Sequence, residues 1–372
     1  MKIVVALLLA SLALCAEIAV AVKSDLSIVG QKVIDNDIKD SEYEYALKTF
    51  LIAVDEDQVV DVEFDVQSKR VFSDFDGLDP ISLEGYLKHS SLSKNKDRLN
   101  YYISEPMYMR GVRIVQLAVS LYDYKDRELT LYDNLDLRIS IQSPSDYSGG
   151  FNSKPLSNDF NSIISSLVDN YDQQSRSNDI SSCILFICGG NSLSHPSVQD
   201  LIEWRKELGY EVHTAETSQI GSTTAAIKSY IEEAYQNWSN PPEYIVLIGD
   251  TGGSYAIPYF STTWGSSDYD YTLIEGDDLL PEMIVGRISA EGSSDLSNII
   301  NKTLVYEKAS YIDFTGTDWY ESAALNADPS SSGNSTIITN EYVEEILEIN
   351  GFENIGTNYG DGNYSSWMQN QL

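Results

Sequence analysis

Acidic side chains crowd the stretch 244–287, in which Arg287 is the single basic residue. Between the apolar runs at its two ends lie the carboxylates of Asp268, Asp270, Glu275, Asp277, Asp278 and Glu282. A hard cation would balance this charge, because Ca²⁺ takes roughly six to eight oxygen ligands at about 2.3–2.6 Å. A solvated acidic loop is the alternative that composition alone leaves open.

One further carboxylate, that of Asp250, comes directly after the apolar run 244–248. This run predicts a buried strand, and parallel α/β sheets bind their ligands beyond the carboxyl ends of the strands. A rigidly held Asp250 therefore favours the cation-binding interpretation.

Nucleophiles and bases are few. Cys183 and Cys188 lie in one predicted strand, about 16 Å apart at about 3.3 Å per residue, which excludes a disulfide between them. We interpret both as structural thiols, because inert cysteines are typical of apolar strands. His195, at a predicted helix start, and His213, in a predicted strand, are also interpreted as structural. No complete catalytic constellation is found, so no catalytic residue is assigned.

A glycine pair, Gly189-Gly190, follows the first of these strands. Its spacing is not the G-x-G-x-x-G of a dinucleotide-binding turn. A nucleotide-binding α/β protein therefore remains a minor alternative, which would show ATP or NAD affinity.

Strand and helix patterns alternate after residue 181, as expected for a parallel α/β domain. Strands are predicted at 183–188, 210–214, 244–248, 283–285 and 322–326. Helices are predicted from Ser194 to Gly209, at 223–238, from Ser293 onward and at 341–349.

The first part of the chain has a different pattern. Period-two alternation at 59–66, 112–119 and 135–141 predicts half-buried strands, and a succession of them predicts a β-sandwich. The stretch 143–180 is rich in Ser, Asn and Asp and is interpreted as a linker that exposes Lys154 and Arg176.

The N-terminus has the features of a secretory signal peptide. Lys2 precedes an apolar run, and small residues follow, with Ala16 or Ala21 as the residue before the cut. The apolar run is short for a transmembrane span. The formal charge of −33 would repel phosphate backbones, which argues against a nucleic-acid partner. An extracellular protein is expected.

Several short blocks in this order and spacing resemble the gingipain-type cysteine peptidases, a secreted, caspase-like family. The blocks are Tyr-Ile-Val-Leu-Ile-Gly-Asp at 244–250, Ile257-Pro258, Ser267-Asp268, Tyr271, Gly276-x-Asp278, Glu282, Val285-Gly286-Arg287 and Tyr306-Glu307. Arg110-Gly111 and the strands after it are similar to the end of the family's β-rich prodomain. Residues 181–372 are similar to the first part of its catalytic domain.

The resemblance implies a structural calcium ion. Its ligands would be the carboxylates of Asp250, Asp278 and Glu282 and the backbone carbonyls of Glu275 and Leu280. The family's catalytic His, in a Gly-His-Gly turn, and its later Cys have no match in this sequence, so the resemblance implies that both lie beyond Leu372. Arg-specific members carry an acid where this chain has 334–336, which leaves specificity for Arg unsupported.

We therefore expect a secreted cysteine endopeptidase precursor, a zymogen that acts on protein or peptide substrates. Its own prodomain is expected to inhibit it until the linker is cut, with Lys154 and Arg176 as the two candidate activation sites. The expected parts are a signal peptide (1–21), an all-β sandwich prodomain (22–142), a linker (143–180), the first half of an α/β caspase-like, Rossmann-like domain with a mostly parallel sheet (181–312), and the start of its catalytic half (313–372). The domain is expected to be incomplete at its C-terminus, so this fragment alone would be inactive. The alternative is a catalytically silent, calcium-binding surface or adhesion module with the same fold.

Overall fold

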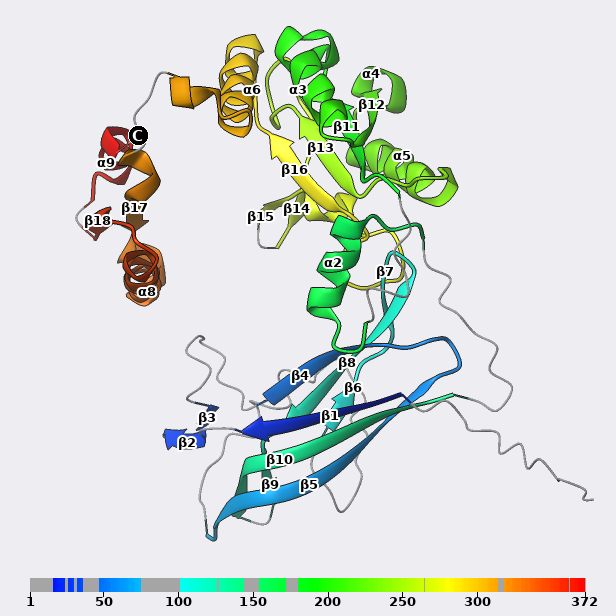
Figure 1. Ribbon diagram of the computed structural model, residues 1–372, viewed down its shortest axis with the longest axis vertical. Helices are drawn as coiled ribbons and strands as arrows, with labels where there is room; N and C mark the ends of the chain where they lie inside the picture. Colours follow the sequence, from blue (N-terminus) through cyan, green and yellow to red (C-terminus); the bar gives the residue numbers. More distant parts are fainter. Residues whose placement is uncertain are drawn as a thin grey trace, which may run out of the picture. The chain divides into compact units, whose positions relative to one another are not determined.

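The computed structural model describes residues 16–23, 26–29, 32–35, 47–74, 101–125, 127–143, 154–171, 180–263, 265–313, 318–360 and 362–371. Arg176 lies outside these ranges. The chain forms two compact units, Met1–Ile299 and Ile300–Leu372 (Figure 1).

Two antiparallel sheets make up the N-terminal part of the first unit. The first contains β1 (Ala16–Lys23), β10 (Glu128–Gln142), β5 (Val59–Phe72) and β9 (Tyr122–Lys125). The second contains β4 (Leu47–Ala53), β8 (Val112–Ser120), β6 (Tyr101–Ile103) and β7 (Met107–Met109), and a separate hairpin pairs β2 (Leu26–Val29) with β3 (Lys32–Asp35). Alternate residues of β8 and β10 enter one hydrophobic cluster, which includes Leu117, Val119, Leu135, Leu137 and Ile139. The strands predicted from period-two alternation are confirmed.

A two-residue turn, Arg110-Gly111, joins β7 to β8. Both residues have positive φ, 48° and 72°, and Met109 pairs with Val112 across the turn. Positive φ at both central residues defines a type I′ turn, whose twist matches that of antiparallel strands. The turn therefore holds Arg110 at the tip of a regular hairpin.

Part of the expected linker is packed into the first unit. Helix α2 (Asn158–Leu167) begins after Ser157, whose hydroxyl accepts a hydrogen bond from Phe160 N at 3.2 Å. Phe160 and Ile164 are buried in a cluster with Met109 from the hairpin. The amphipathic pattern of α2 thus outweighs the polar composition around it.

A parallel sheet follows, in the order β12 (Glu211–Glu216), β11 (Cys183–Cys188), β13 (Tyr244–Ile248), β16 (Ile284–Ile288). Its helices are α3 (Pro196–Glu207), α4 (Thr217–Ile220), α5 (Thr224–Asn237) and α6 (Ser293–Glu307), the last of which continues into the second unit. Shorter elements are η2 (Ser192–Ser194), β14 (Phe260–Thr262), β15 (Gly265–Ser267) and η3 (Tyr269–Tyr271). The parallel α/β pattern predicted after residue 181 is confirmed (Figure 1).

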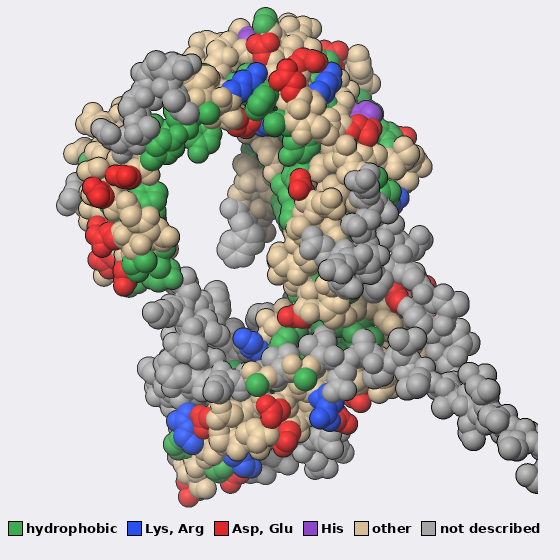
Figure 2. Space-filling view, in the orientation of Figure 1, with side chains coloured by type: hydrophobic (Ala, Val, Ile, Leu, Met, Phe, Trp, Pro, Cys, Tyr) green, Lys and Arg blue, Asp and Glu red, His purple; other side chains and the backbone are tan. Residues whose placement is uncertain are grey.

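The second unit contains a parallel pair, β17 (Ser322–Ala327) and β18 (Asn354–Tyr359). Its other elements are η4 (Ser310–Asp313), η5 (Asp318–Glu321), α7 (Pro329–Ser332), α8 (Ser335–Ile349) and α9 (Tyr364–Gln371). Among the described helices, none is long and apolar enough to span a bilayer. On the face seen in Figure 2, acidic side chains are scattered rather than gathered in one patch.

The loop 250–257 closes tightly over the carboxyl ends of β11 and β13. A Cβ atom on Gly249 would lie 1.8 Å from the carbonyl oxygen of Tyr255, and one on Gly189 would lie 2.1 Å from the same atom. Gly249 also has a φ of 146°, which residues with a side chain rarely adopt. Only glycine fits at these two positions.

We predict that Gly249→Ala lowers the free energy of unfolding by about 2–3 kcal/mol, because the methyl group forces the backbone of the loop away from the sheet. Urea unfolding followed by circular dichroism measures the change. Gly292→Ala is the matched control, since its Cβ meets nothing within 4 Å. Equal urea midpoints for the two variants would show that the loop is not packed as described.

Candidate functional site

The acidic stretch meets the N-terminal sheets at Arg110, whose side chain is fully buried. Its guanidinium donates hydrogen bonds of 2.7–3.2 Å to the carbonyl oxygens of Pro155, Pro241, Pro242 and Glu282. Its Cζ atom also lies 5.1 Å from the ring centroid of Phe160 and 5.6 Å from that of Tyr235. One cation from the hairpin tip thus satisfies four backbone acceptors.

The strongest counter-charge acting on Arg110 is that of Glu243, a fully buried residue directly before β13. Burial lowers the pKa of Arg110, and the Glu243 carboxylate is the strongest influence in the opposite direction. Ser157 donates to the two oxygens of Glu243, from its N–H at 2.7 Å and from its hydroxyl at 2.6 Å. The buried carboxylate is therefore hydrogen-bonded through both of its oxygens, as burial of a polar group requires.

Backbone N–H groups of the hairpin bind the carboxylates of Asp278 and Glu275, two of the residues predicted to bind calcium. Tyr108 N donates to Asp278 Oδ2 at 2.9 Å, and Gly111 N donates to Glu275 Oε2 at 2.7 Å. The other Asp278 oxygen accepts from Leu280 N at 2.7 Å. Sequence reasoning missed these donors because the hairpin contacts join residues 164 to 170 positions apart in the chain.

Glu282 has an unusual environment for a carboxylate. It is fully buried, and its Oε2 accepts from Ile274 N at 2.6 Å, whereas its Oε1 has no hydrogen-bond partner. The pKa of Glu282 is raised to about 7, mainly by burial and also by the charges of Glu275 and Asp278, whereas hydrogen bonding to the backbone N–H groups of Ile274 and Glu275 lowers it. A buried oxygen without a donor, beside two other acids, fits a cation ligand.

The five predicted calcium ligands are not brought together. Asp250 follows β13 at its carboxyl end, whereas Glu282 precedes β16 at its amino end, and the five-residue parallel pair alone spans about 13 Å. Two ligands of one Ca²⁺ ion lie within about 5 Å of each other. No three of the loop's described carboxylates come within 4.8 Å of one another. The other four residues lie at one edge of the sheet, away from Asp250: Glu275, Asp278, Leu280 and Glu282.

At the carboxyl edge, Asp250 is bound by protein donors. Its Oδ1 accepts from Thr251 N and from the Ser289 hydroxyl, both at 2.7 Å. The Ser289 hydrogen bond is the main cause of its lowered pKa. Asp250 therefore helps to fix the loop that follows β13.

Arg287 organises the same edge. Its Nε and Nη2 donate to the two oxygens of Asp268 at 2.8 and 2.7 Å, and its Nη1 donates to the carbonyl oxygens of Gly249 and Ile257 at 2.9 and 3.0 Å. A guanidinium matches a carboxylate in this bidentate way. One of the loop's acids is thus neutralised within the stretch itself.

The two strand thiols are poor nucleophiles. Cys183 and Cys188 are fully buried, and burial raises the pKa of each thiol to about 12. Because the thiolate is the nucleophilic form, neither cysteine is suited to attack a carbonyl at neutral pH. His195 caps helix α3, where its Nδ1 accepts from Ser197 N at 3.3 Å. These positions agree with the structural roles expected from the sequence.

The α/β domain is the part of this chain that matches a known class of hydrolases. The model of Peptidase family C25 matches residues 181–371, just over half of the chain. The chain belongs to this family, which confirms the resemblance to gingipain-type peptidases.

Curated relatives include Lys-gingipain of Porphyromonas gingivalis, 28% identical over 251 residues that cover 62% of this chain and 14% of that protein. Gingipain R2 of the same organism is 32% identical over 113 residues, or 30% of this chain and 15% of that protein. The chain thus spans about one seventh of the length of these relatives.

Two solved structures are similar at a lower sequence identity. The Arg-specific cysteine proteinase gingipain R has 24% identity and a TM-score of 0.41, covering 51% of this chain and 44% of that one. The complex of the pro- and mature domains of Porphyromonas gingivalis RgpB has 25% identity and a TM-score of 0.40. The match covers 48% of this chain and 42% of that one.

We predict that Arg110→Met lowers the free energy of unfolding by at least about 3 kcal/mol, because four buried carbonyl oxygens lose their charged donor and Glu243 loses an attractive charge. Urea unfolding monitored by tryptophan fluorescence provides the measurement. Arg138→Met serves as control, since Arg138 forms an ion pair with Glu63 in which both side chains are about 60% exposed. Such a pair contributes little to stability. Similar losses in both variants would refute the role given to Arg110.

Proposed function

We propose that the protein is a cysteine endopeptidase, made as a secreted precursor, that hydrolyses peptide bonds with a Cys–His pair. The match of residues 181–371 to Peptidase family C25 is the observation that supports this most directly. In such chemistry the His acts as base toward the Cys thiol. The thiolate then attacks the peptide carbonyl, and an acyl-enzyme forms and is hydrolysed.

The proposal assigns the reacting Cys and His to residues beyond this sequence. Cys183 and Cys188 lie in a buried strand and have thiols with a pKa of about 12, so neither is suited to be the nucleophile. Residues 1–372 would then form the N-terminal sheets and the first part of the α/β domain. They would not catalyse hydrolysis alone.

We also propose that the N-terminal sheets act as an intramolecular inhibitor. The contacts of Arg110, Gly111 and Tyr108 with the α/β domain support a tight association. Lys154, one of the two predicted activation sites, donates to Gln236 O at 3.2 Å and lies 5.1 Å from the Tyr235 ring centroid. We therefore assign the activating cut to the other site, Arg176.

For the leader peptide we propose cleavage after Ala16. Strand β1 pairs residues 16–23 with β10 without interruption. A cut after Ala21, the boundary expected from the sequence, would remove most of this strand, whereas a cut after Ala16 retains nearly all of it.

We predict that purified residues 1–372 do not cleave peptides, whereas the protein encoded by the complete reading frame, once cut at Arg176, does so in a thiol-dependent manner. Hydrolysis of a casein substrate, with and without iodoacetamide, measures both. Iodoacetamide-sensitive proteolysis by the fragment that is lost in Cys183→Ser or Cys188→Ser would contradict the assignment. A complete protein that stays inactive after this cut would contradict the proposed function itself.

Calcium is proposed for a reduced set of ligands, Glu275, Asp278, Leu280 and Glu282. The unpartnered Oε1 of Glu282 and the two neighbouring acids support a cation at this edge. Bound calcium would offset the mutual repulsion of these carboxylates. Its ligands would come from the loop that also contacts the N-terminal hairpin.

We predict that millimolar Ca²⁺ raises the melting temperature of the wild-type chain, since a ligand at about 100 times its Kd stabilises the folded state by about 2.7 kcal/mol. Glu282→Gln should abolish the increase, and Asp250→Asn should leave it unchanged. Differential scanning fluorimetry in Ca²⁺ and in Mg²⁺ makes the comparison. An increase that depends on Asp250, or no increase in the wild type, would refute this ligand set.

A further inference from the structure

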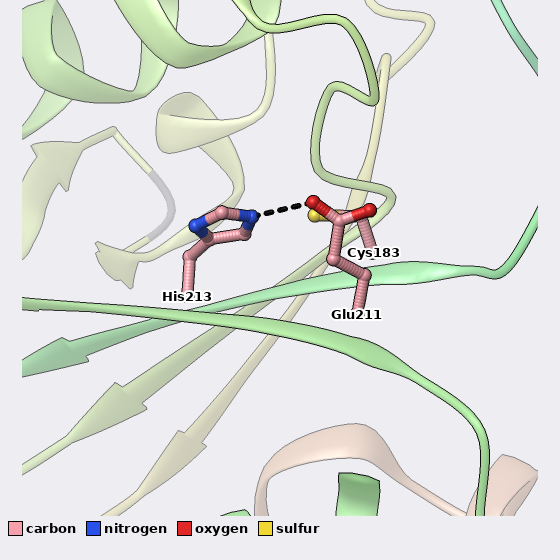
Figure 3. A group of neighbouring side chains, drawn as sticks. All are labelled: Cys183, Glu211 and His213. Carbon is pink, nitrogen blue, oxygen red and sulfur yellow. Dashed lines mark hydrogen bonds and ion pairs between the residues drawn. The ribbon is translucent and has the colours of Figure 1, made fainter.

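Cys183, Glu211 and His213 form a group of side chains of the types that bind transition metals (Figure 3). One ligand atom from each residue lies within 4.8 Å of the ligand atoms of the other two. The group combines a sulfur, an imidazole nitrogen and a carboxylate oxygen, which are the three ligand types that Zn²⁺ takes in proteins.

Strand register places these residues together. Parallel pairing of β11 with β12 sets Cys183 opposite Glu211 and Leu185 opposite His213. Residues two apart in a strand face the same side of the sheet, so Glu211 and His213 project on the side of Cys183. The arrangement is therefore a consequence of regular backbone geometry and needs no special loop.

Hydrogen bonds orient the ligands. His213 Nε2 lies 2.7 Å from Glu211 Oε1, and Glu211 Oε2 accepts from Asn240 Nδ2 at 2.7 Å. The Trp238 ring lies against the imidazole, with ring centroids 4.4 Å apart. Figure 3 shows the imidazole nitrogen and the Cys183 sulfur both close to one oxygen of Glu211.

The group has one buried and one open side. The Cys183 side chain is fully buried, whereas the side chains of His213 and Glu211 are 40% and 45% exposed. A metal ion could enter from solvent and keep a water molecule in its fourth position, as three-ligand zinc sites do. A fixed second-shell donor, here Asn240, is also typical of such sites.

We propose that Cys183, Glu211 and His213 bind a zinc ion that cross-links β11 and β12. The thiolate and the carboxylate together balance the charge of Zn²⁺, and the neutral imidazole donates through Nε2. On binding, the ion takes the place of the hydrogen bond between His213 and Glu211, and the imidazole proton moves from Nε2 to Nδ1 by exchange with solvent. The thiol proton of Cys183 is released to solvent. The proposal is independent of the peptidase function and of the calcium ligands.

Cobalt is the probe for this site, because Co²⁺ accepts the same ligands and absorbs light when bound to a thiolate. We expect the purified 372-residue chain, reduced and metal-free, to bind one Co²⁺ with a thiolate charge-transfer band, which Zn²⁺ then removes. Cys183→Ser should abolish the band, and Cys188→Ser, in the same strand, should preserve it.

Three variants test the site with all thiols in place. His213→Ala should weaken Co²⁺ binding strongly, whereas His195→Ala should not, and Asn240→Ala should weaken it about 10- to 100-fold through loss of second-shell orientation. Quenching of Trp238 fluorescence by Co²⁺ gives a second readout. Absence of a thiolate band in the wild type, persistence of the band in Cys183→Ser, or equal affinity in His213→Ala and His195→Ala would overturn the proposal.

Discussion

The buried guanidinium of Arg110 is the interaction on which the first unit depends. It joins the tip of an antiparallel hairpin to four carbonyl oxygens and lies beside the buried carboxylate of Glu243. Backbone acceptors buried without a donor are costly, so the four carbonyl oxygens rely on one side chain. The positive φ angles of Arg110 and Gly111 bring that side chain to the tip.

The hairpin that carries Arg110 also helps to offset the negative charge of the acidic stretch 244–287. The carboxylates of this stretch accept hydrogen bonds mainly from protein donors: Asp268 from Arg287, Asp278 from Tyr108 N and Glu275 from Gly111 N. Glu282 is the exception, with a buried oxygen that no donor reaches. The N-terminal sheets and any bound cation therefore act on the same loop, which links the proposed inhibitory role to the proposed calcium site.

Much of the α/β domain could be predicted from the sequence, because apolar runs such as 183–188 and 244–248 match the observed strands residue by residue. Contacts between distant segments could not, as shown by Arg110, which lies 172 residues before Glu282. Asp250 and Glu282 belong to one acidic stretch of the sequence, yet they lie at opposite ends of the sheet. Likewise, Cys183 meets Glu211 and His213 only through strand register, which no local pattern encodes.

The association of the N-terminal sheets with the α/β domain is tested most directly by cutting the chain between them. A specific protease site introduced within residues 172–179 would allow the chain to be cleaved under native conditions and then run on a size-exclusion column. The contacts of Arg110 and its neighbours predict that the two fragments elute together at micromolar concentration. Separate elution of the fragments would contradict the account.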